Sequence, residues 1–188
     1  MKVTPQSIPE VLLVEPKRHG DDRGFFSEVW KRRALAEAGL DTDFVQDNHS
    51  LSRQVGVLRG LHFQRPPTAQ GKLVRVTRGR ILDVAVDIRQ GSPSYGQHVA
   101  VELSAENWRQ LWVPRGFAHG FLTLEPDTEV IYKVDAEYDP ATDAGIAWDD
   151  PALGISWPVP EGGPTLSDKD RKAPRLSDIP APFPQGSV

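Results

Sequence analysis

The middle of the chain alternates between short apolar segments and turn residues, and this alternation limits the possible folds more than any other feature. The apolar segments are β-branched or alternate with polar residues, and they cover residues 73–76, 81–88, 99–103, 111–113, 121–124 and 130–134. Turn formers such as Arg78-Gly79 and Gly91-Ser92-Pro93 separate them. Short strands spaced in this way are typical of a β-sandwich or barrel. We therefore predict an all-β fold.

Helical signals are few. Residues 31–39 are rich in Ala and end at a glycine, which predicts one short helix, and residues 104–108 allow at most one further turn. A chain of 188 residues is long enough to bury a substantial core, and we expect one domain spanning 1–188. Proline is concentrated after Asp150, so residues 158–188 are expected to form a wrapping or partly flexible tail.

Charge and composition exclude several classes of protein. The formal net charge of −4 and the pI near 5.7 argue against a nucleic-acid-binding surface, because phosphate binding needs a broad basic face. The chain has no cysteine, which removes disulfides and thiolate metal sites and fits a reducing compartment. The sequence contains neither a signal-peptide core nor an 18-residue apolar run. We expect a soluble cytoplasmic protein without a membrane partner.

Ionisable groups are densest between residues 56 and 75. Arg59, His62, Lys72 and Arg75 lie on two short segments that are expected to form adjacent strands. An imidazole can accept a proton near neutral pH, and the neighbouring cations are suited to anionic oxygens. This stretch therefore predicts a site that combines proton transfer with anion binding.

A second motif brings another histidine into consideration. In residues 114–121 a proline and two glycines precede or flank His119, a pattern by which cupin barrels place a second histidine opposite one from an earlier strand. Metal-binding cupins commonly carry a His-x-His pair, but here Gln64 follows His62. Two imidazoles are too few for a closed or catalytic metal site, so we predict no metal.

Two carboxylates also share one strand face. Asp83 and Asp87 alternate with apolar residues in 82–88, so both side chains point the same way. They could form a catalytic dyad, but burial with ion-pair or hydrogen-bond partners explains them adequately.

Taken together, these motifs resemble the dTDP-4-dehydrorhamnose 3,5-epimerase family over residues 1–175. The resemblance rests on eight ordered segments: 22–28 (DRGFFSE), 44–50 (FVQDNHS), 56–64 (GVLRGLHFQ), 70–75 (QGKLVR), 83–89 (DVAVDIR), 114–121 (PRGFAHGF), 131–133 (IYK) and 166–170 (LSDKD). It implies a cupin jelly roll that needs neither metal nor organic cofactor. It also implies epimerisation of dTDP-4-dehydro-6-deoxy-D-glucose at C3 and C5, on the route to dTDP-L-rhamnose for cell-envelope polysaccharide.

The resemblance also implies roles for individual residues. His62 would be the base, with Asp170 as its partner, and Tyr132 would return a proton from the opposite face of the sugar. Lys72 would face the C4 oxygen, with His119 beside it. This chemistry is sound, because a C4 ketone acidifies the C–H bonds at C3 and C5 and a positioned cation stabilises the enolate.

A second group of residues is assigned to the nucleotide by resemblance. Guanidinium groups suit a diphosphate, amides and carboxylates can read a pyrimidine edge, and an aromatic ring offers a stacking face. The substrate-binding candidates besides Lys72 and His119 are Arg23, Phe26, Glu28, Gln46, Asp47, Asn48, Arg59, Asp143 and Lys169. The family pattern usually has Glu at the position of Asp143.

Several alternatives remain open at the level of sequence. His62 and Tyr132 can be ordinary buried residues with satisfied hydrogen bonds, and Arg23 and Arg59 can be surface ion-pair residues. Asp168 lies two residues from Asp170 and would exchange roles with it after a small register error. The protein could also be an epimerase that inverts only C5 or only C3 in an antibiotic-sugar pathway, or a binding module without turnover. The resemblance further implies a homodimer in which residues 23–28 complete the neighbour's site.

Overall fold

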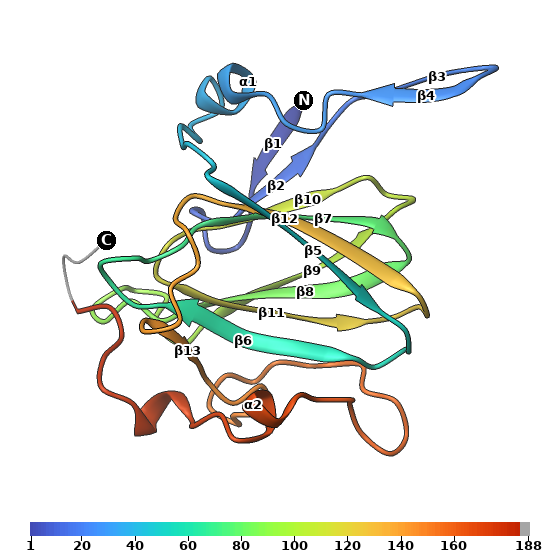
Figure 1. Ribbon diagram of the computed structural model, residues 1–188. Helices are drawn as coiled ribbons and strands as arrows, with labels where there is room; N and C mark the ends of the chain where they lie inside the picture. Colours follow the sequence, from blue (N-terminus) through green and yellow to red (C-terminus); the bar gives the residue numbers. More distant parts are fainter. Residues whose placement is uncertain (185–188) are drawn as a thin grey trace.

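Two facing β-sheets form the body of the protein. The computed structural model describes residues 1–184, and Figure 1 shows the sheets stacked as two layers. In the six-stranded sheet the order is β1 (Lys2–Pro5), β2 (Leu12–Glu15), β10 (Gln110–Val113), β7 (Lys72–Arg78), β12 (Thr128–Val134) and β5 (Gln46–Ser52). In the five-stranded sheet it is β13 (Asp143–Gly145), β6 (Leu58–Gln64), β11 (Phe117–Thr123), β8 (Arg80–Asp87) and β9 (His98–Ser104). The predicted all-β sandwich is confirmed.

The chain passes repeatedly from one sheet to the other. Strands β10, β11, β12 and β13 follow one another in sequence yet lie alternately in the six-stranded and the five-stranded sheet. All pairings between the named strands are antiparallel. This is the connectivity of a jelly roll, and it brings residues far apart in sequence to the space between the sheets.

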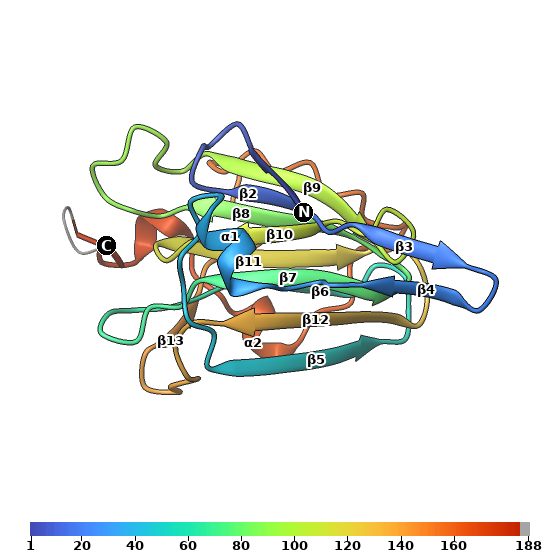
Figure 2. The same cartoon turned by 90° about the horizontal axis from the view of Figure 1, so that it is seen from above.

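Inward-facing apolar side chains of both sheets form the central core. Val74, Val76 and Val130 from one sheet pack with Ile81 and Phe121 from the other. They belong to strands that the sequence predicted, because β-branched residues at alternate positions fit a half-buried pleated surface. Figure 2 shows the six-stranded sheet from above, with β11 and β6 beneath it.

The C-terminal segment covers the outer face of the five-stranded sheet. It contains two short helices, α2 (Asp168–Arg171) and the 3₁₀ turn η1 (Leu176–Asp178), and lies beneath β6 in Figure 1. Leu176 and Phe183 are buried in a cluster with Leu61, Phe63 and Val86 of the sheet. The segment therefore extends the core instead of building its own; residues 185–188 of the expected tail lie outside the described residues.

The predicted helix at 31–39 is shorter than expected. α1 covers only Arg32–Ala36, and Leu35 is its one buried residue. Lys31 at the N-cap makes no side-chain capping hydrogen bond, and a single buried position provides little tertiary packing. A helix of this composition therefore ends after little more than one turn.

A hairpin projects from the body next to α1. Strands β3 (Arg18–Asp21) and β4 (Gly24–Ser27) pair only with each other, and both Figures 1 and 2 show them extending away from the sheets. The rings of Phe25 and Phe26 are exposed on it. An isolated two-stranded hairpin is marginally stable in water, so this arm is suited to lie against another surface.

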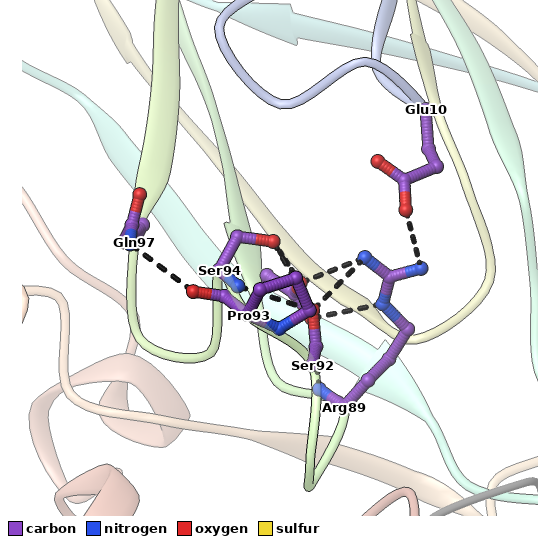
Figure 3. Close-up of polar contacts among 7 residues, drawn as sticks. Glu10, Arg89, Ser92, Pro93, Ser94 and Gln97 are labelled. Carbon is purple, nitrogen blue, oxygen red and sulfur yellow. Dashed lines mark hydrogen bonds and ion pairs between the residues drawn. The ribbon is translucent and has the colours of Figure 1, made fainter.

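The two aspartates of β8 are both completely buried and serve different networks. Asp87 accepts hydrogen bonds from Arg89 and from the hydroxyls of Ser92 and Ser94, at 2.6–2.9 Å. Figure 3 shows Arg89 between Glu10 and this turn. Burial pushes the pKa of Asp87 upward, but these hydrogen bonds outweigh it and leave the pKa below its usual value. Asp87 therefore ties the β8–β9 loop to the core, whereas Asp83 points toward the site described next.

Candidate active site

A cavity of about 440 Å³ opens between the two sheets and is closed on one side by the C-terminal segment. Its ionisable lining comes from several elements: Arg59 and His62 on β6, Lys72 on β7, His119 on β11, Tyr132 on β12, and Asp170 in α2. A second cavity of about 250 Å³ shares His62, Lys72 and Tyr132 with the first. The two cavities therefore meet at these three residues.

The pairing of β6 with β11 brings the two histidines together. His62 and His119 are direct partners in the ladder. The two strands approach closely here because both carry a glycine, Gly60 and Gly120. A Cβ added to Gly60 would lie only 2.5 Å from the Cα of Gly120, so only glycine fits at this position. Gly60 also has a φ of 135°, which L-residues rarely adopt. The expectation that His62 and His119 share a cavity is met by this geometry.

His62 is hydrogen-bonded to a carboxylate that arrives from the far end of the chain. Its Nε2 lies 2.5 Å from Oδ1 of Asp170, while Ser167 Oγ donates to Oδ2 of the same carboxylate at 2.8 Å. Burial raises the pKa of Asp170, but the hydrogen bonds from His62 and Ser167 and the Lys169 charge bring it below its ordinary value. Asp170 is thus ionised at neutral pH and holds the imidazole with Nδ1 free to accept a proton.

The alternative partner, Asp168, lies outside the cavity. Its side chain is 91% exposed, and its nearest cation is Arg171, at 3.8 Å. Ser167 caps the N-terminus of α2 by accepting a hydrogen bond from the backbone N–H of Asp170. This cap sets the register of the turn, and the register directs the side chain of Asp170 to His62.

Lys72 is buried at the junction of the two cavities. Desolvation, together with the nearby charge of Lys169, lowers the pKa of Lys72 to about 8, although the carboxylates of Asp143 and Asp83 raise it. The ammonium Nζ lies 3.4 Å from the carbonyl oxygen of His62. Lys72 is therefore a poorly hydrated cation, suited to bind an oxygen that acquires negative charge.

Beside it, His119 forms a second buried histidine–carboxylate pair. His119 Nε2 lies 2.8 Å from Oδ1 of Asp83, and both side chains are almost completely buried. The other carboxylate oxygen of Asp83 has no hydrogen-bond partner among residues 1–184. The pair fixes the orientation of the His119 ring, which also lines the cavity.

Tyr132 faces the cavity from the opposite sheet. It belongs to β12 of the six-stranded sheet, whereas His62 belongs to β6 of the five-stranded sheet, and both line the two cavities. Burial raises the pKa of Tyr132, the Arg59 charge lowers it and Asp143 raises it; the net shift is upward. The phenol stays protonated across the neutral range, so the site holds a proton acceptor and a proton donor on opposite walls.

The predicted nucleotide residues divide into two groups. Arg59 lines the first cavity, and Gln46, Asn48, Asp143 and Lys169 line the second. Asp143 forms an ion pair with Lys169 at the edge of the cavity. The structure therefore brings five of these residues to the site.

The other nucleotide candidates do not reach the cavity of their own chain. Asp47 points to the opposite face of β5 and pairs with Lys133. Arg23 is 90% exposed on the hairpin and pairs with Asp21, and Phe26 and Glu28 line a separate hollow near α1. Within one chain these four assignments are not realised, because strand alternation turns Asp47 outward and the hairpin projects away from the body.

Tyr138 also lies in the site, although the sequence motifs did not predict it. Its ring is 55% exposed in the second cavity, and its hydroxyl lies 3.2 Å from Asp143 Oδ2. A tyrosine before Asp139-Pro140, just beyond the strand that ends at Val134, was the available signal, because it marks an exposed aromatic residue on a turn at a strand end.

Two further observations concern residues 1–184 only. They contain no cluster of three or more histidine, aspartate or glutamate side chains arranged to hold a metal ion. None of the helices in this part of the chain has the length and apolarity needed to cross a membrane.

Comparison with known proteins gives a consistent result. The family model described as dTDP-4-dehydrorhamnose 3,5-epimerase matches residues 5–178. The enzyme of that name from Sinorhizobium fredii is 55% identical over 177 residues, covering 94% of this chain and 90% of its own, and the one from Salmonella typhimurium is 54% identical, covering 94% and 96%. The crystal structure of dTDP-6-deoxy-D-glucose-3,5-epimerase from Legionella pneumophila, in complex with dTDP-4-keto-L-rhamnose, superposes with a TM-score of 0.94 at 46% identity, covering 100% and 99%. The chain therefore belongs to the dTDP-4-dehydrorhamnose 3,5-epimerase family.

Proposed function

We propose that this protein is an isomerase that converts dTDP-4-dehydro-6-deoxy-D-glucose to dTDP-4-dehydro-L-rhamnose by inverting C3 and C5, without a cofactor. The observation that carries the proposal is the placement of His62 and Tyr132 on opposite sheets around one cavity, with Lys72 at the junction. Inversion of a carbon next to a ketone needs a base on one face, an acid on the other and a cation for the enolate oxygen.

Each inversion begins with removal of a proton. Nδ1 of His62 takes the proton from the carbon beside the C4 carbonyl; the electron pair of the C–H bond forms a carbon–carbon double bond to C4, and the π pair of the carbonyl moves to its oxygen, which gives an enolate. Asp170, hydrogen-bonded to Nε2, stabilises the imidazolium that forms. Because Asp170 is fixed in turn by Ser167, the imidazole needs no reorientation during this step.

Lys72 and His119 act on the oxygen. The enolate oxygen carries the developing charge, and a desolvated ammonium stabilises it more strongly than a hydrated one would. Tyr132 then protonates the carbon from the opposite face, and exchange with water restores the phenol and the neutral imidazole. The same groups serve C3 and C5, since both carbons flank the one carbonyl.

The nucleotide end of the substrate fits the second cavity. Arg59, which lines the first cavity, provides a guanidinium fork for the diphosphate between the sugar and the nucleoside. Tyr138 presents an exposed ring, on which a pyrimidine can stack, and the amide of Asn48 lies in the same cavity. Phe26, which was predicted to stack on the base, lies away from the cavity of its own chain and would contribute instead to the site of a second copy.

The exposed hairpin supports a homodimer. Arg23, Phe26 and Glu28 lie on a projecting arm, outside their own cavity. We propose that this arm completes the site of a second copy, with each 188-residue chain forming one epimerase domain. We also place the enzyme in the cytoplasm, because its nucleotide-sugar substrate and its lack of cysteine suit a reducing compartment.

Incubation with the 4-keto sugar nucleotide in deuterated water tests the function. NMR should locate deuterium at both C3 and C5. Label at C5 alone or at C3 alone would replace the proposal with a single-site epimerase of an antibiotic-sugar pathway. Tight binding of the sugar nucleotide without any exchange would instead identify a binding module.

A further inference from the structure

Glutamine side chains hold the loop that follows β12. This loop, residues 135–142, connects β12 to β13. In each of residues 136–139, one backbone N–H or carbonyl group forms a hydrogen bond with a glutamine side chain. The hydrogen bonds are Gln70 Nε2 to Ala136 O at 2.7 Å, Gln64 Nε2 to Glu137 O at 3.1 Å, Tyr138 N to Gln46 Oε1 at 3.0 Å, and Asp139 N to Gln64 Oε1 at 2.7 Å. The loop is thus tied to β5, to β6 and to the β6–β7 connection.

Gln64 uses its whole amide in this arrangement. Besides its two bonds to the loop, Nε2 donates to the carbonyl oxygen of Thr68 at 2.7 Å, and the residue is only 3% exposed. An amide nitrogen has two hydrogens, and both are used. Although Gln64 borders the second cavity, its nitrogen has no hydrogen left for a ligand.

The amide is well matched to this position, two residues after His62. The three hydrogen bonds of Gln64 use two donors and one acceptor: one donor and the acceptor hold the loop, and the other donor binds Thr68 in the β6–β7 connection. A histidine offers one donor and one acceptor when neutral, and an ionised glutamate offers acceptors only. The position where metal-binding cupins commonly carry a second histidine is therefore used here to fix a loop.

We propose that Gln64, assisted by Gln70, is a positioning residue for nucleotide binding, acting through the loop that carries Tyr138. Surface loops are ordinarily the mobile parts of a fold, and an exposed ring keeps a fixed orientation only when its backbone is held. This inference rests on the proposed function, in which the Tyr138 ring contacts the base. Gln64 does not line the first cavity, so its loss should weaken nucleotide binding and leave proton transfer intact.

The test compares two buried strand residues whose side chains form hydrogen bonds with the loops at the two ends of β12. Gln64→Met keeps the volume and removes all three hydrogen bonds. Thr128→Val is the matched control, because the buried Thr128 hydroxyl donates to Glu125 O at 2.8 Å in the loop before the strand. We expect Gln64→Met to raise the Kd for dTDP, measured by calorimetry, about tenfold, with kcat within threefold of wild type. Thr128→Val should lower the melting temperature but change the Kd less than twofold.

A double-mutant cycle tests the route of the effect. If Gln64 acts through the loop, adding Gln64→Met to Tyr138→Ala should change the Kd less than twofold beyond Tyr138→Ala alone. The inference would be overturned if the Kd of the double variant rose by the product of the two single-variant factors, or if Gln64→Met bound dTDP as tightly as wild type. If Gln64→Met does not fold, Gln70→Met is tested in its place, and we expect it to raise the Kd for dTDP about threefold. A wild-type protein that fails to bind dTDP would instead overturn the proposed function itself.

Discussion

Replacing Asp170 by Asn tests how the base is activated. The substitution keeps the shape of the side chain: the amide oxygen can still accept from His62 Nε2, and the new NH₂ can donate to Ser167 Oγ. Only the negative charge is lost. A hydrogen bond to a charged group is worth roughly 1 kcal/mol more than a neutral one. The attraction between imidazolium and carboxylate, at about 4 Å and an effective dielectric constant near 20, is worth up to about 4 kcal/mol.

The expected loss lies between these limits, at about 3 kcal/mol, which corresponds to roughly 100-fold in kcat. The rate of deuterium incorporation at C3 and C5 measures it directly. Since the pKa of Asp170 is below its ordinary value, wild-type Asp170 is ionised at pH 7, and the deficit measured there reflects loss of its charge.

Asp168→Asn is the matched control, because that carboxylate is two residues away and exposed. It should retain the wild-type rate within about twofold, as exposed charges of this kind contribute little. Equal losses in both variants, or more than half of the wild-type rate in Asp170→Asn, would refute the assignment of Asp170 as the partner of His62.

The remaining predictions concern the acid, the cation, the core and the arm. Tyr132→Phe should still exchange a proton with solvent at the face of His62 but form little epimerised product by NMR; normal product formation would exclude Tyr132 as the acid. Because only protonated Lys72 binds the enolate, kcat should fall as the pH rises through about 8, and Lys72→Met should lose that dependence together with about 100–1,000-fold in rate. Asp87→Asn should lower the free energy of unfolding, measured with urea at pH 7, by about 3 kcal/mol, since it breaks a buried ion pair. The folded pKa of Asp87 is depressed, so its contribution is present above about pH 4 and is lost as the pH falls further; an equal deficit at pH 3 would contradict this. Arg23→Ala should raise the KM without changing stability, and light scattering that shows an active 20.8 kDa monomer would contradict the role of the arm.

The central strands could be predicted because their pattern is local. The alternation of residues 81–88 predicted a strand, and β8 covers Arg80–Asp87. Its residues 83–87 are all buried, however, because the C-terminal segment covers one face of the strand and the other face packs against the six-stranded sheet. The helix at 31–39 was predicted too long, because residue composition does not reveal that only Leu35 would be buried. β1, β2 and the hairpin were not predicted, since their pairing depends on contacts distant in sequence.

The site could be predicted only in part, for the same reason. The motifs gave the identities of His62, Lys72 and Tyr132 by resemblance, but not the fact that two sheets place them around one cavity. The choice between Asp168 and Asp170 depended on a helix cap that sets the register of one turn. Tyr138 was missed because its position depends on hydrogen bonds that the loop backbone donates to glutamine side chains elsewhere in the chain.

The carboxylate that serves His62 is separated from it by 108 positions, in a segment that packs onto the sandwich from outside. The apolar side chains of this segment share one buried cluster with those of β6 and β8, so the segment serves the core and the site at once. A protease cut at the exposed residues 161–163 would separate Asp170 from His62 and uncover part of that cluster in a single event. Loss of activity and loss of stability would therefore occur together.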